Sequence, residues 1–452
     1  MHLRRFRNGR HGAEQTRSSG IFERHSPARR HAGLISVGLF ALFLAAFAAS
    51  PVRTSYDSMW SLHTAMSFAQ GHDGNLAADL PILEQRKFYA IDSPDGRPRT
   101  VYPIGASLLA VPAVAVYSWF RPHFADDLRN GTADGVEQFI ASIIGAAAGV
   151  VFFWVILSQF QSLAIAVASA VIFCFCTSIW STATRALWQH GPLVLMLVIA
   201  MLLLVRAWRR PALIQYVSLP LAMAYLMRPT AIVPIGILSI YVLACHRAWF
   251  ARYAFWGMCI AIPWVAYNVS IYGMVLPPYY SAAAFSETTR FAEGLAGNLF
   301  SPSRGLFVFS PVLLFALSGF ALALRDRERR PLYIAYGAIV VADLIIVGSA
   351  SMWWAGHSFG PRFTTDIVPF LVYFVAFNFR LPATFRPRTQ AALSTGIGAL
   401  AVVSLLIHAQ GALRPSTMSW NAVPNNIDQN TSRAWDWSDP QFARTEAYRG
   451  PR

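Results

Sequence analysis

Asp57 is the first side chain to consider as a catalytic group in this sequence. It lies in a polar stretch, residues 53–103, which directly follows the first long apolar run of the chain. From Asp57 to Gln70 the apolar residues recur at helical spacing, which places the carboxylate at the N-terminal end of a predicted helix. A carboxylate in that position either caps the helix or serves as a general base.

Further charged or titratable side chains are concentrated in the same stretch, whereas the rest of the chain is mostly apolar. They are His63, Asp73, Asp79, Glu84, Arg86, Lys87, Asp92, Asp95, Arg97 and Arg99. This concentration makes residues 53–103 the first candidate for the chemistry. The apolar segments that follow are expected to hold this stretch against one face of a membrane.

Arg228 is the second residue of interest, because it interrupts two apolar runs in the sequence Met227-Arg228-Pro229. A charged side chain at the middle of a bilayer costs at least about 2.5 kcal/mol unless it finds a partner or reaches water. Two interpretations remain open. Arg228 either extends to the outer interface or binds the phosphate of a lipid.

Arg362 resembles Arg228 in preceding an apolar run, but it follows a polar loop. Gly356, Gly360 and Pro361 precede it and indicate a loop of defined shape. The alternative to a ligand-binding role is an (i, i+4) ion pair with Asp366 across the start of the next span.

A third polar group follows another apolar run and contains Arg185, Trp188, Gln189 and His190. Aromatic residues commonly mark the membrane interface, so a structural role and a substrate contact are both open for this group. Arg304, in a turn rich in Ser and Pro, is expected to be an anchor before a span.

Several classes of chemistry lack sequence support. We find no Walker A sequence, no glycine-rich dinucleotide motif and no His-Glu-x-x-His, so nucleotide hydrolysis and zinc peptidase activity are not indicated. All four cysteines fall in or at the end of apolar runs, where they are expected to pack and not to form disulfides or bind zinc. They are Cys174, Cys176, Cys245 and Cys259.

The composition defines the fold class. Of 452 residues, 55% are hydrophobic and only 13% are charged. Many apolar runs approach the length of about 20 residues with which a helix crosses hydrocarbon. A closed barrel would instead show short alternating strands. We therefore predict an all-α polytopic membrane protein.

The formal net charge of +15 would suggest nucleic acid as the partner of a soluble protein. Here the arginines form short blocks between apolar runs, so they report membrane orientation and no nucleic-acid partner is expected. They also decide how to interpret residues 102–120, which are apolar enough to span. If this segment is instead a helix at the outer surface, the later arginine blocks all lie inside, as the positive-inside rule prefers.

With that choice the sequence predicts about eleven transmembrane helices and a large outer first loop with surface helices. The predicted spans are 33–52, 138–158, 163–180, 192–208, 212–226, 230–246, 253–271, 306–324, 332–349, 365–380 and 389–409. The expected organisation is a disordered basic cytoplasmic arm (1–33), a transmembrane domain (34–409) whose first outer loop covers 53–137, and an external C-terminal tail (410–452). The tryptophans of the tail, Trp420, Trp435 and Trp437, suit the membrane interface.

The order of these parts resembles the GT-C superfamily of integral-membrane glycosyltransferases. The segments that carry the resemblance are Tyr56-Asp57-Ser58-Met59-Trp60, Tyr102-Pro103-Ile104-Gly105, Arg228-Pro229-Thr230-Ala231 and Phe359-Gly360-Pro361-Arg362. It is most similar to the bacterial branch related to protein mannosyltransferases and the aminoarabinose transferase of lipid A. The resemblance covers most of residues 34–380 as an architecture.

The resemblance implies inverting transfer of a sugar from a polyprenyl-phosphate donor to a lipid or polysaccharide acceptor on the outer face. Asp57 matches the outer-loop aspartate of the family and would take the proton of the acceptor hydroxyl. Arg228 and Arg362 would hold the lipid phosphate as its charge grows. The further substrate-binding candidates are His190, Arg185, Glu84, Asp79 and Tyr102, with Asp79 and Glu84 assigned to a second acceptor contact or a metal.

The sequence departs from the family pattern at two places. Many relatives carry two adjacent acids at the first site, whereas Ser58 follows Asp57 here. The second outer loop lacks the acid that several relatives carry, having only Arg185 and His190. No cofactor is required by these residues, no metal ligand is assigned, and a divalent metal is left open.

Two other functions compete with the enzyme. A transporter or flippase for a lipid-linked or anionic substrate would carry charged residues deep in its spans and internal repeats. Only Asp343 lies well inside a predicted span, and no clear repeat is visible. A non-catalytic scaffold would tolerate Asp57→Asn. The expected location is a bacterial inner membrane, with multiple spans and the site facing the periplasm.

Overall fold

The computed structural model describes residues 27–54, 57–133, 135–281, 290–380 and 386–444. It is 71% helical with almost no strand, and six of its helices are long and apolar enough to cross a membrane. These six are α1 (Pro27–Ala48), α6 (Val136–Phe160), α8 (His190–Ala207), α11 (Arg247–Tyr272), α15 (Arg330–Gly348) and α17 (Pro387–Leu413). The prediction of an all-α polytopic membrane protein is confirmed.

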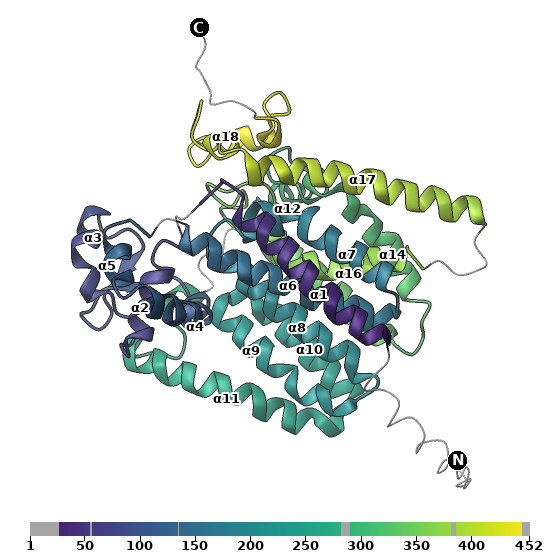
Figure 1. The fold of residues 1–452 in the computed structure, drawn as a ribbon, viewed down its shortest axis with the longest axis horizontal. Coiled ribbons are helices and arrows are strands. Elements are labelled where there is room, and N and C mark those ends of the chain that lie inside the picture. Colours follow the sequence, from purple (N-terminus) through teal and green to yellow (C-terminus); the bar gives the residue numbers. More distant parts are fainter. Residues whose placement is uncertain (1–26, 55–56, 134, 282–289, 381–385, 445–452) are drawn as a thin grey trace.

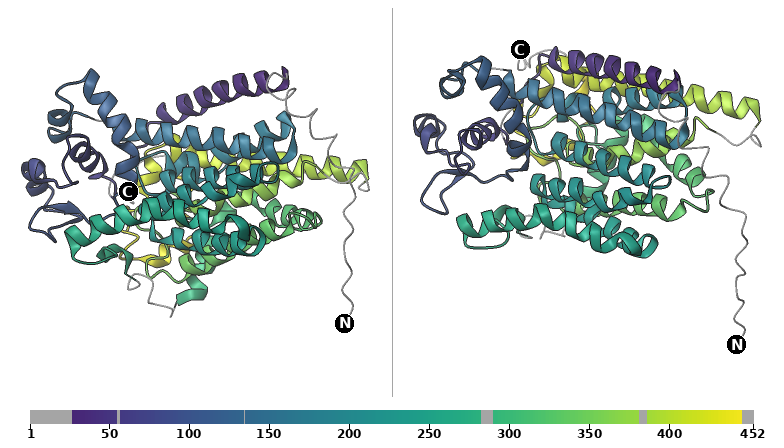
Figure 2. Two further views of the ribbon diagram at one scale, coloured as in Figure 1. Left: turned by 90° about the horizontal axis from the view of Figure 1, so that it is seen from below. Right: turned by 60° about the horizontal axis from the view of Figure 1, so that its bottom comes forward.

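Shorter apolar helices complete the bundle. They are α7 (Leu163–Phe175), α9 (Ser218–Met227), α10 (Ile232–Cys245), α14 (Phe315–Ala323) and α16 (Val368–Phe377), of which the last four follow a 3-10 turn. All of these helices run roughly along one direction, side by side (Figures 1 and 2). Each of the predicted spans overlaps one of the long or short helices.

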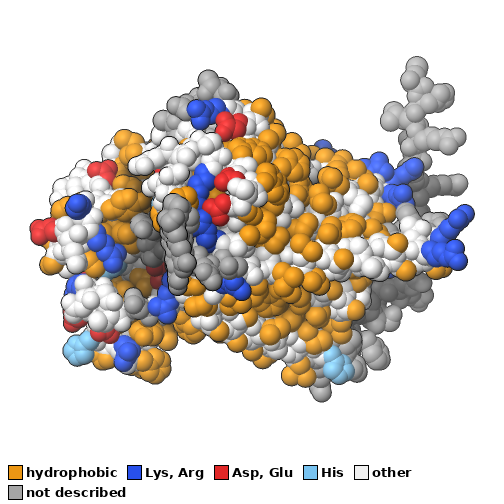
Figure 3. All heavy atoms as spheres, turned by 90° about the horizontal axis from the view of Figure 1, so that it is seen from above, with side chains coloured by type: hydrophobic (Ala, Val, Ile, Leu, Met, Phe, Trp, Pro, Cys, Tyr) orange, Lys and Arg blue, Asp and Glu red, His pale blue; other side chains and the backbone are white. Residues whose placement is uncertain are grey.

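The bundle has a protein-packed centre and a periphery suited to lipid. Within the apolar part of α8, 72% is buried, whereas the corresponding figure for α11 is 17%. Many large apolar side chains of the peripheral helices are exposed, and Figure 3 shows them across the middle of one face. Because exposing such side chains to water is unfavourable, this surface is expected to contact hydrocarbon.

Three predicted boundaries need correction. The first helix begins at Pro27, so residues 27–33 belong to it and not to the basic arm; a proline fits the first turn of a helix because its missing N–H needs no partner there. Residues 1–26 of that arm lie outside the described residues. The expected span 163–180 ends at Phe175, before a π-helical turn. The expected span 306–324 is broken after Phe309, because Pro311 cannot donate to a continuous helix.

The arginine blocks gather at the Phe160 end of α6, the central helix. Arg206 Nε lies 3.3 Å from Ser158 Oγ, Arg329 Nη1 lies 3.1 Å from Gln159 Oε1, and Arg380 Nη1 lies 3.2 Å from the Phe160 carbonyl. At a rise of 1.5 Å per residue, the 25 residues of α6 separate this end from the other by about 37 Å.

The first loop lies at the opposite, Val136 end of α6. It contains α2 (Ser61–Ala69), α3 (Leu80–Gln85), α4 (Gly105–Phe120), α5 (Phe124–Arg129) and an antiparallel strand pair, β1 (Ile91–Asp92) and β2 (Arg99–Thr100). Figures 1 and 2 show these elements together at one end of the bundle. Helix α4 therefore lies at that end, as predicted for residues 102–120. Its first residue, Gly105, approaches α9 so closely that a Cβ would lie 2.5 Å from the Leu226 carbonyl.

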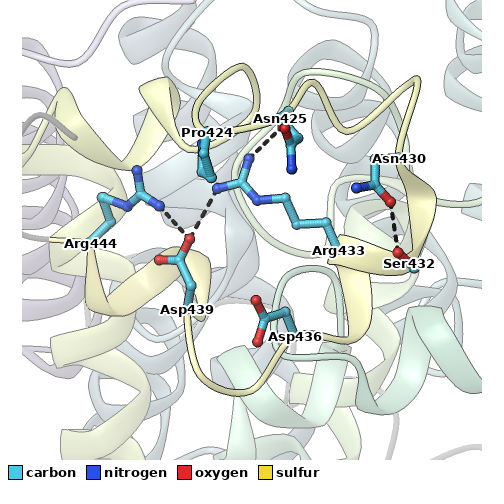
Figure 4. Close-up of a pocket in the computed structure, with 8 residues that line it drawn as sticks. All are labelled: Pro424, Asn425, Asn430, Ser432, Arg433, Asp436, Asp439 and Arg444. Atoms are coloured by element: carbon cyan, nitrogen blue, oxygen red, sulfur yellow. Dashed lines mark hydrogen bonds and ion pairs between the residues drawn. The ribbon is translucent and has the colours of Figure 1, made fainter. Parts of the chain in front are cut away.

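The C-terminal tail packs on the loops at this same end. It contains α18 (Ser416–Ser419) and two 3-10 turns, 431–435 and 441–443. Trp420 is fully buried and clusters with Trp353 and Trp354, so it does not face the membrane interface as expected; Trp437 is exposed. An open hollow of ≈ 570 Å³ lies on the tail, where Arg433 and Arg444 both donate to Asp439 (Figure 4).

Arg304 joins the tail to the bundle, which is more than the anchoring role predicted from sequence. Its side chain is 1% exposed, and its guanidinium donates to Asn421 Oδ1 and Gln441 Oε1 of the tail, each at 2.7 Å. It also donates to the carbonyls of Trp354 and Gly356. Because every one of these acceptors is neutral, the contacts fix loop geometry and do not form an ion pair.

The arrangement predicts on which side of the membrane each end of the bundle lies. A reporter enzyme that works only outside the cytoplasm should be active when fused after Asn130 and inactive when fused after Arg209, since these residues lie at opposite ends of the bundle. Activity after both residues, or after neither, would contradict the placement of α4 at the loop end.

Candidate active site

Asp57 and Arg362 form an ion pair, although they lie 305 positions apart in the chain. Asp57 follows the first span, and Arg362 ends the loop before α16. That loop turns sharply, with φ of +58° at Ala355, +59° at Gly356 and +60° at Gly360. At Gly360 a Cβ would lie 2.7 Å from the Phe309 ring, so only glycine fits both the backbone and the space.

Two aromatic residues hold the pair in place. The Tyr102 hydroxyl donates to Asp57 Oδ1 at 3.2 Å, and the Arg362 guanidinium lies over the Trp188 ring, 4.1 Å from its centroid. Burial by itself would raise the pKa of Asp57, but the charge and hydrogen bond of Arg362, together with Tyr102, lower it below its usual value. Asp57 is therefore an ionised carboxylate at neutral pH.

A second charged cluster lies beside the first. Asp366 accepts from Arg228 Nη1 at 2.7 Å and contacts His190 Nδ1 at 2.8 Å. His190 is near enough to Asp57 to contribute to the lowered pKa of that carboxylate. The alternative predicted from sequence, an Arg362–Asp366 pair, is wrong: Arg362 turns toward Asp57, and Asp366 is occupied by Arg228 and His190.

The structure thus brings together five of the predicted site residues, and the three others make their contacts outside this cluster. Arg185 donates to the Phe47 carbonyl at 2.7 Å and caps the end of α1. Asp79 pairs with His63 at 3.1 Å and with Arg129 at 3.3 Å. Glu84 is exposed on α3 and makes no ion pair with a described residue.

Glu137, at the start of α6, was not recognised as a site residue from sequence. Its Oε1 accepts from Ser58 Oγ at 2.5 Å and from the Leu187 N–H at 2.8 Å. Ser58 is next to Asp57, and Leu187 is next to Trp188, so one carboxylate fixes both sides of the Asp57–Arg362 pair. The signal that could have shown this is an acid in the first turn of a span, next to the loop that carries Asp57.

The described residues contain no preformed cluster of side chains for a metal ion. Among them, no group of three or more His, Cys, Asp and Glu side chains converges as metal ligands would. Two acids of the first loop are instead paired with arginine: Arg99 Nη2 lies 2.7 Å from Asp73 Oδ2 and 2.6 Å from Asp95 Oδ2.

The helical bundle with surface helices at one end resembles the GT-C fold of solved polytopic membrane proteins. One similar solved structure is ArnT from Cupriavidus metallidurans bound to undecaprenyl phosphate, with a TM-score of 0.50 and 12% identity over 92% of this chain and 75% of ArnT. Another is the oligosaccharyltransferase of Archaeoglobus fulgidus tethered to an acceptor peptide, with a TM-score of 0.51 and 11% identity. That similarity covers 94% of this chain and 61% of the oligosaccharyltransferase.

At these identities the shared feature is the fold, which confirms the resemblance noted from the sequence. No protein-family profile matches the chain, and no curated protein sequence matches it.

The Asp57–Arg362 pair predicts a pH-dependent contribution to stability. The pKa of Asp57 in the folded chain lies below its ordinary value of 3.8. The ion pair therefore stabilises the fold fully above pH 3.8, and this stabilisation is lost as the pH falls through the lower pKa of the folded chain. Asp57→Asn should lower the free energy of unfolding by about 1–3 kcal/mol at pH 7, measured by unfolding in mixed micelles. The deficit should shrink below pH 3.8.

Asp92→Asn is the matched control, because Asp92 is an exposed acid of the same loop without a described ion pair. It should change stability by less than about 0.5 kcal/mol at either pH. A deficit of Asp57→Asn that is absent at pH 7, or that grows on acidification, would contradict the ion pair.

Proposed function

We propose that this protein transfers a sugar from a polyprenyl-phosphate-linked donor to a lipid or polysaccharide acceptor of the cell envelope, with inversion at the anomeric carbon. The observation that carries the proposal is the partly buried Asp57–Arg362 pair beside Arg228, at the loop end of a GT-C bundle. The bound undecaprenyl phosphate of ArnT and the acceptor peptide of the oligosaccharyltransferase support a lipid-linked donor and a separate acceptor in general terms.

The proposed reaction is a single displacement. The acceptor oxygen forms a bond to the anomeric carbon as the bond from that carbon to the phosphate oxygen breaks. The acceptor proton passes to the Asp57 carboxylate, and the electron pair of the broken bond remains on the lipid phosphate. A charge therefore develops on the phosphate, and nearby cations stabilise it.

Arg362 retains hydrogen-bond capacity for that phosphate. Only its Nη2 contacts Asp57, and its buried Nε–H has no partner among the described residues. A guanidinium has five donors in a planar fork, so Arg362 can approach an oxyanion without first leaving Trp188. Arg228 supplies a second cation, held in place by Asp366.

The contact between Arg362 and Asp57 also changes the basicity of the Asp57 carboxylate. In the pair, Arg362 lowers the pKa of Asp57, which makes the carboxylate a weak proton acceptor. When the guanidinium shares its charge with a donor phosphate, the pKa of Asp57 rises toward its ordinary value. Asp57 then becomes a stronger base at the moment when the donor is bound, and Tyr102 keeps it oriented.

Transport of a lipid-linked or anionic substrate is the second candidate. One observation favours it: Asp343, in α15, is 4% exposed, and its Oδ2 has no partner among the described residues. An ionisable side chain in that position is typical of an ion or substrate path. The location proposed for either activity is a bacterial inner membrane, with the loop end facing the periplasm.

The test is transfer of radiolabelled sugar in membranes supplied with polyprenyl-phosphate sugars and native envelope acceptors. Asp57→Asn should lower the transfer rate about 10²- to 10⁴-fold, the usual contribution of a general base, at normal protein level. Asp92→Asn, the exposed control, should transfer at the wild-type rate.

Equal transfer by wild type and Asp57→Asn would remove Asp57 from the chemistry. If neither transfers sugar while the acceptors are shown to be adequate, the transport function is favoured over the enzyme.

A further inference from the structure

A second cavity lies beside the Asp57 segment and has a volume of ≈ 300 Å³. Thr54 and Met59, which lie on either side of Asp57 in the chain, both line it. Its charged lining consists of three arginines, Arg53, Arg86 and Arg185, and one acid, Glu137. Ligand pockets commonly have volumes of about 300–1,000 Å³, so the cavity is large enough for a small polar group.

The three arginines have no carboxylate in ion-pair contact among the described residues. Arg53 Nε donates to the neutral amide of Gln138 at 3.1 Å, and the Arg86 guanidinium lies over the Trp60 ring at 5.4 Å. The hydrogen bonds of Arg185 go to backbone carbonyls and to the Thr184 hydroxyl.

Three other acids of the first loop are paired with residues outside this group of arginines. Asp73 and Asp95 are paired with Arg99, and Asp79 is paired with His63 and Arg129. Glu137 accepts hydrogen bonds from Ser58 Oγ and the Leu187 N–H at one of its oxygens, and these donors compensate part of its charge. The described lining therefore keeps an excess of positive charge.

Arg185 is the most deeply buried of the three. It is 1% exposed, and its Nε–H has no hydrogen-bond partner among the described residues. Burial lowers the pKa of Arg185 to about 9. The Thr54 hydroxyl, which also lines the cavity, is buried and unpartnered in the same way. A buried charge without a counter-ion and an unpaired buried hydroxyl are both unfavourable unless a ligand completes their contacts.

We propose that this cavity binds a phosphate group, held by Arg53, Arg86 and Arg185 with the Thr54 hydroxyl. Guanidinium groups match the geometry and charge of phosphate oxygens, and several converge here. Resting on the function proposed above, the cavity takes a phosphate carried by the acceptor, next to the carboxylate that receives the acceptor's proton. It is distinct from the donor arginines, Arg228 and Arg362, which do not line it.

The test measures binding without turnover. Full-length protein in nanodiscs is heated with inorganic phosphate or with chloride at equal ionic strength, and the unfolding temperature is compared. Phosphate should raise it for wild type, and an Arg53→Gln/Arg86→Gln variant should need at least about tenfold more phosphate for the same shift. Arg121→Gln, which removes an exposed arginine at the end of α4, is the matched control and should behave as wild type.

A second arm separates free phosphate from a lipid headgroup. Nanodiscs with phosphatidate are compared with nanodiscs of phosphatidylcholine alone, for the same variants. Stabilisation that depends on Arg53 and Arg86 in either arm supports the cavity, and the arm in which it occurs identifies the source of the phosphate.

The proposal is overturned if wild type is stabilised in neither arm, or if the double variant responds like wild type. It is also overturned if the response is lost in Arg228→Gln and kept in the double variant, because the anion would then bind at the Asp57 site. The binding test requires no sugar transfer. It can therefore fail while the Asp57→Asn transfer test succeeds, and it can succeed while that test fails.

Discussion

A single ion pair between distant parts of the chain, Asp57 with Arg362, governs the candidate site. Each partner alone would be a partly buried charge at the mouth of an apolar bundle, which is unfavourable. Together they neutralise each other, and the rest of the site keeps them in contact. Tyr102 orients the carboxylate, Trp188 supports the guanidinium, and Glu137 fixes the backbone segments next to Asp57 and Trp188.

The C-terminal tail reaches the same pair through one side chain. Gln441 accepts from the Gly360 N–H at 3.0 Å and donates to the Ser358 carbonyl at 2.8 Å, directly before Arg362. Arg304, which is buried, donates to Gln441 in turn. The tail therefore helps to shape the loop that carries Arg362. Through Gln441 it stabilises the sharp turn at Gly360 from outside the bundle.

Much of the fold follows from the sequence, because hydrocarbon demands long apolar helices and arginines mark one end of them. The placement of α4 at the loop end was predictable from the arginine blocks alone. The site was less predictable. Asp57, Arg228 and Arg362 stand out as polar residues in apolar surroundings, but which acid faces which arginine depends on packing between segments that are hundreds of residues apart. Asp366, four residues after Arg362, pairs with Arg228 instead.

The predictions that missed the role of a residue failed for one physical reason. Trp420 looks like an interfacial tryptophan, yet the tail folds back and buries it against Trp353 and Trp354. Glu137 reads as one acid among several in the outer loop, although the hydrogen bonds that it accepts from Ser58 and Leu187 make it a support for Asp57. In both cases the role comes from a long-range contact, to which local patterns are insensitive.

The most direct test of the account is the affinity of purified protein for a polyprenyl phosphate, compared between wild type and Arg362→Gln. If Arg362 binds the donor phosphate, the variant should bind about 10- to 100-fold more weakly, the loss of one charge-assisted contact. Arg97→Gln removes an exposed arginine of the first loop and should bind like wild type. Equal affinity of Arg362→Gln and wild type would contradict the central role assigned to the Asp57–Arg362 pair.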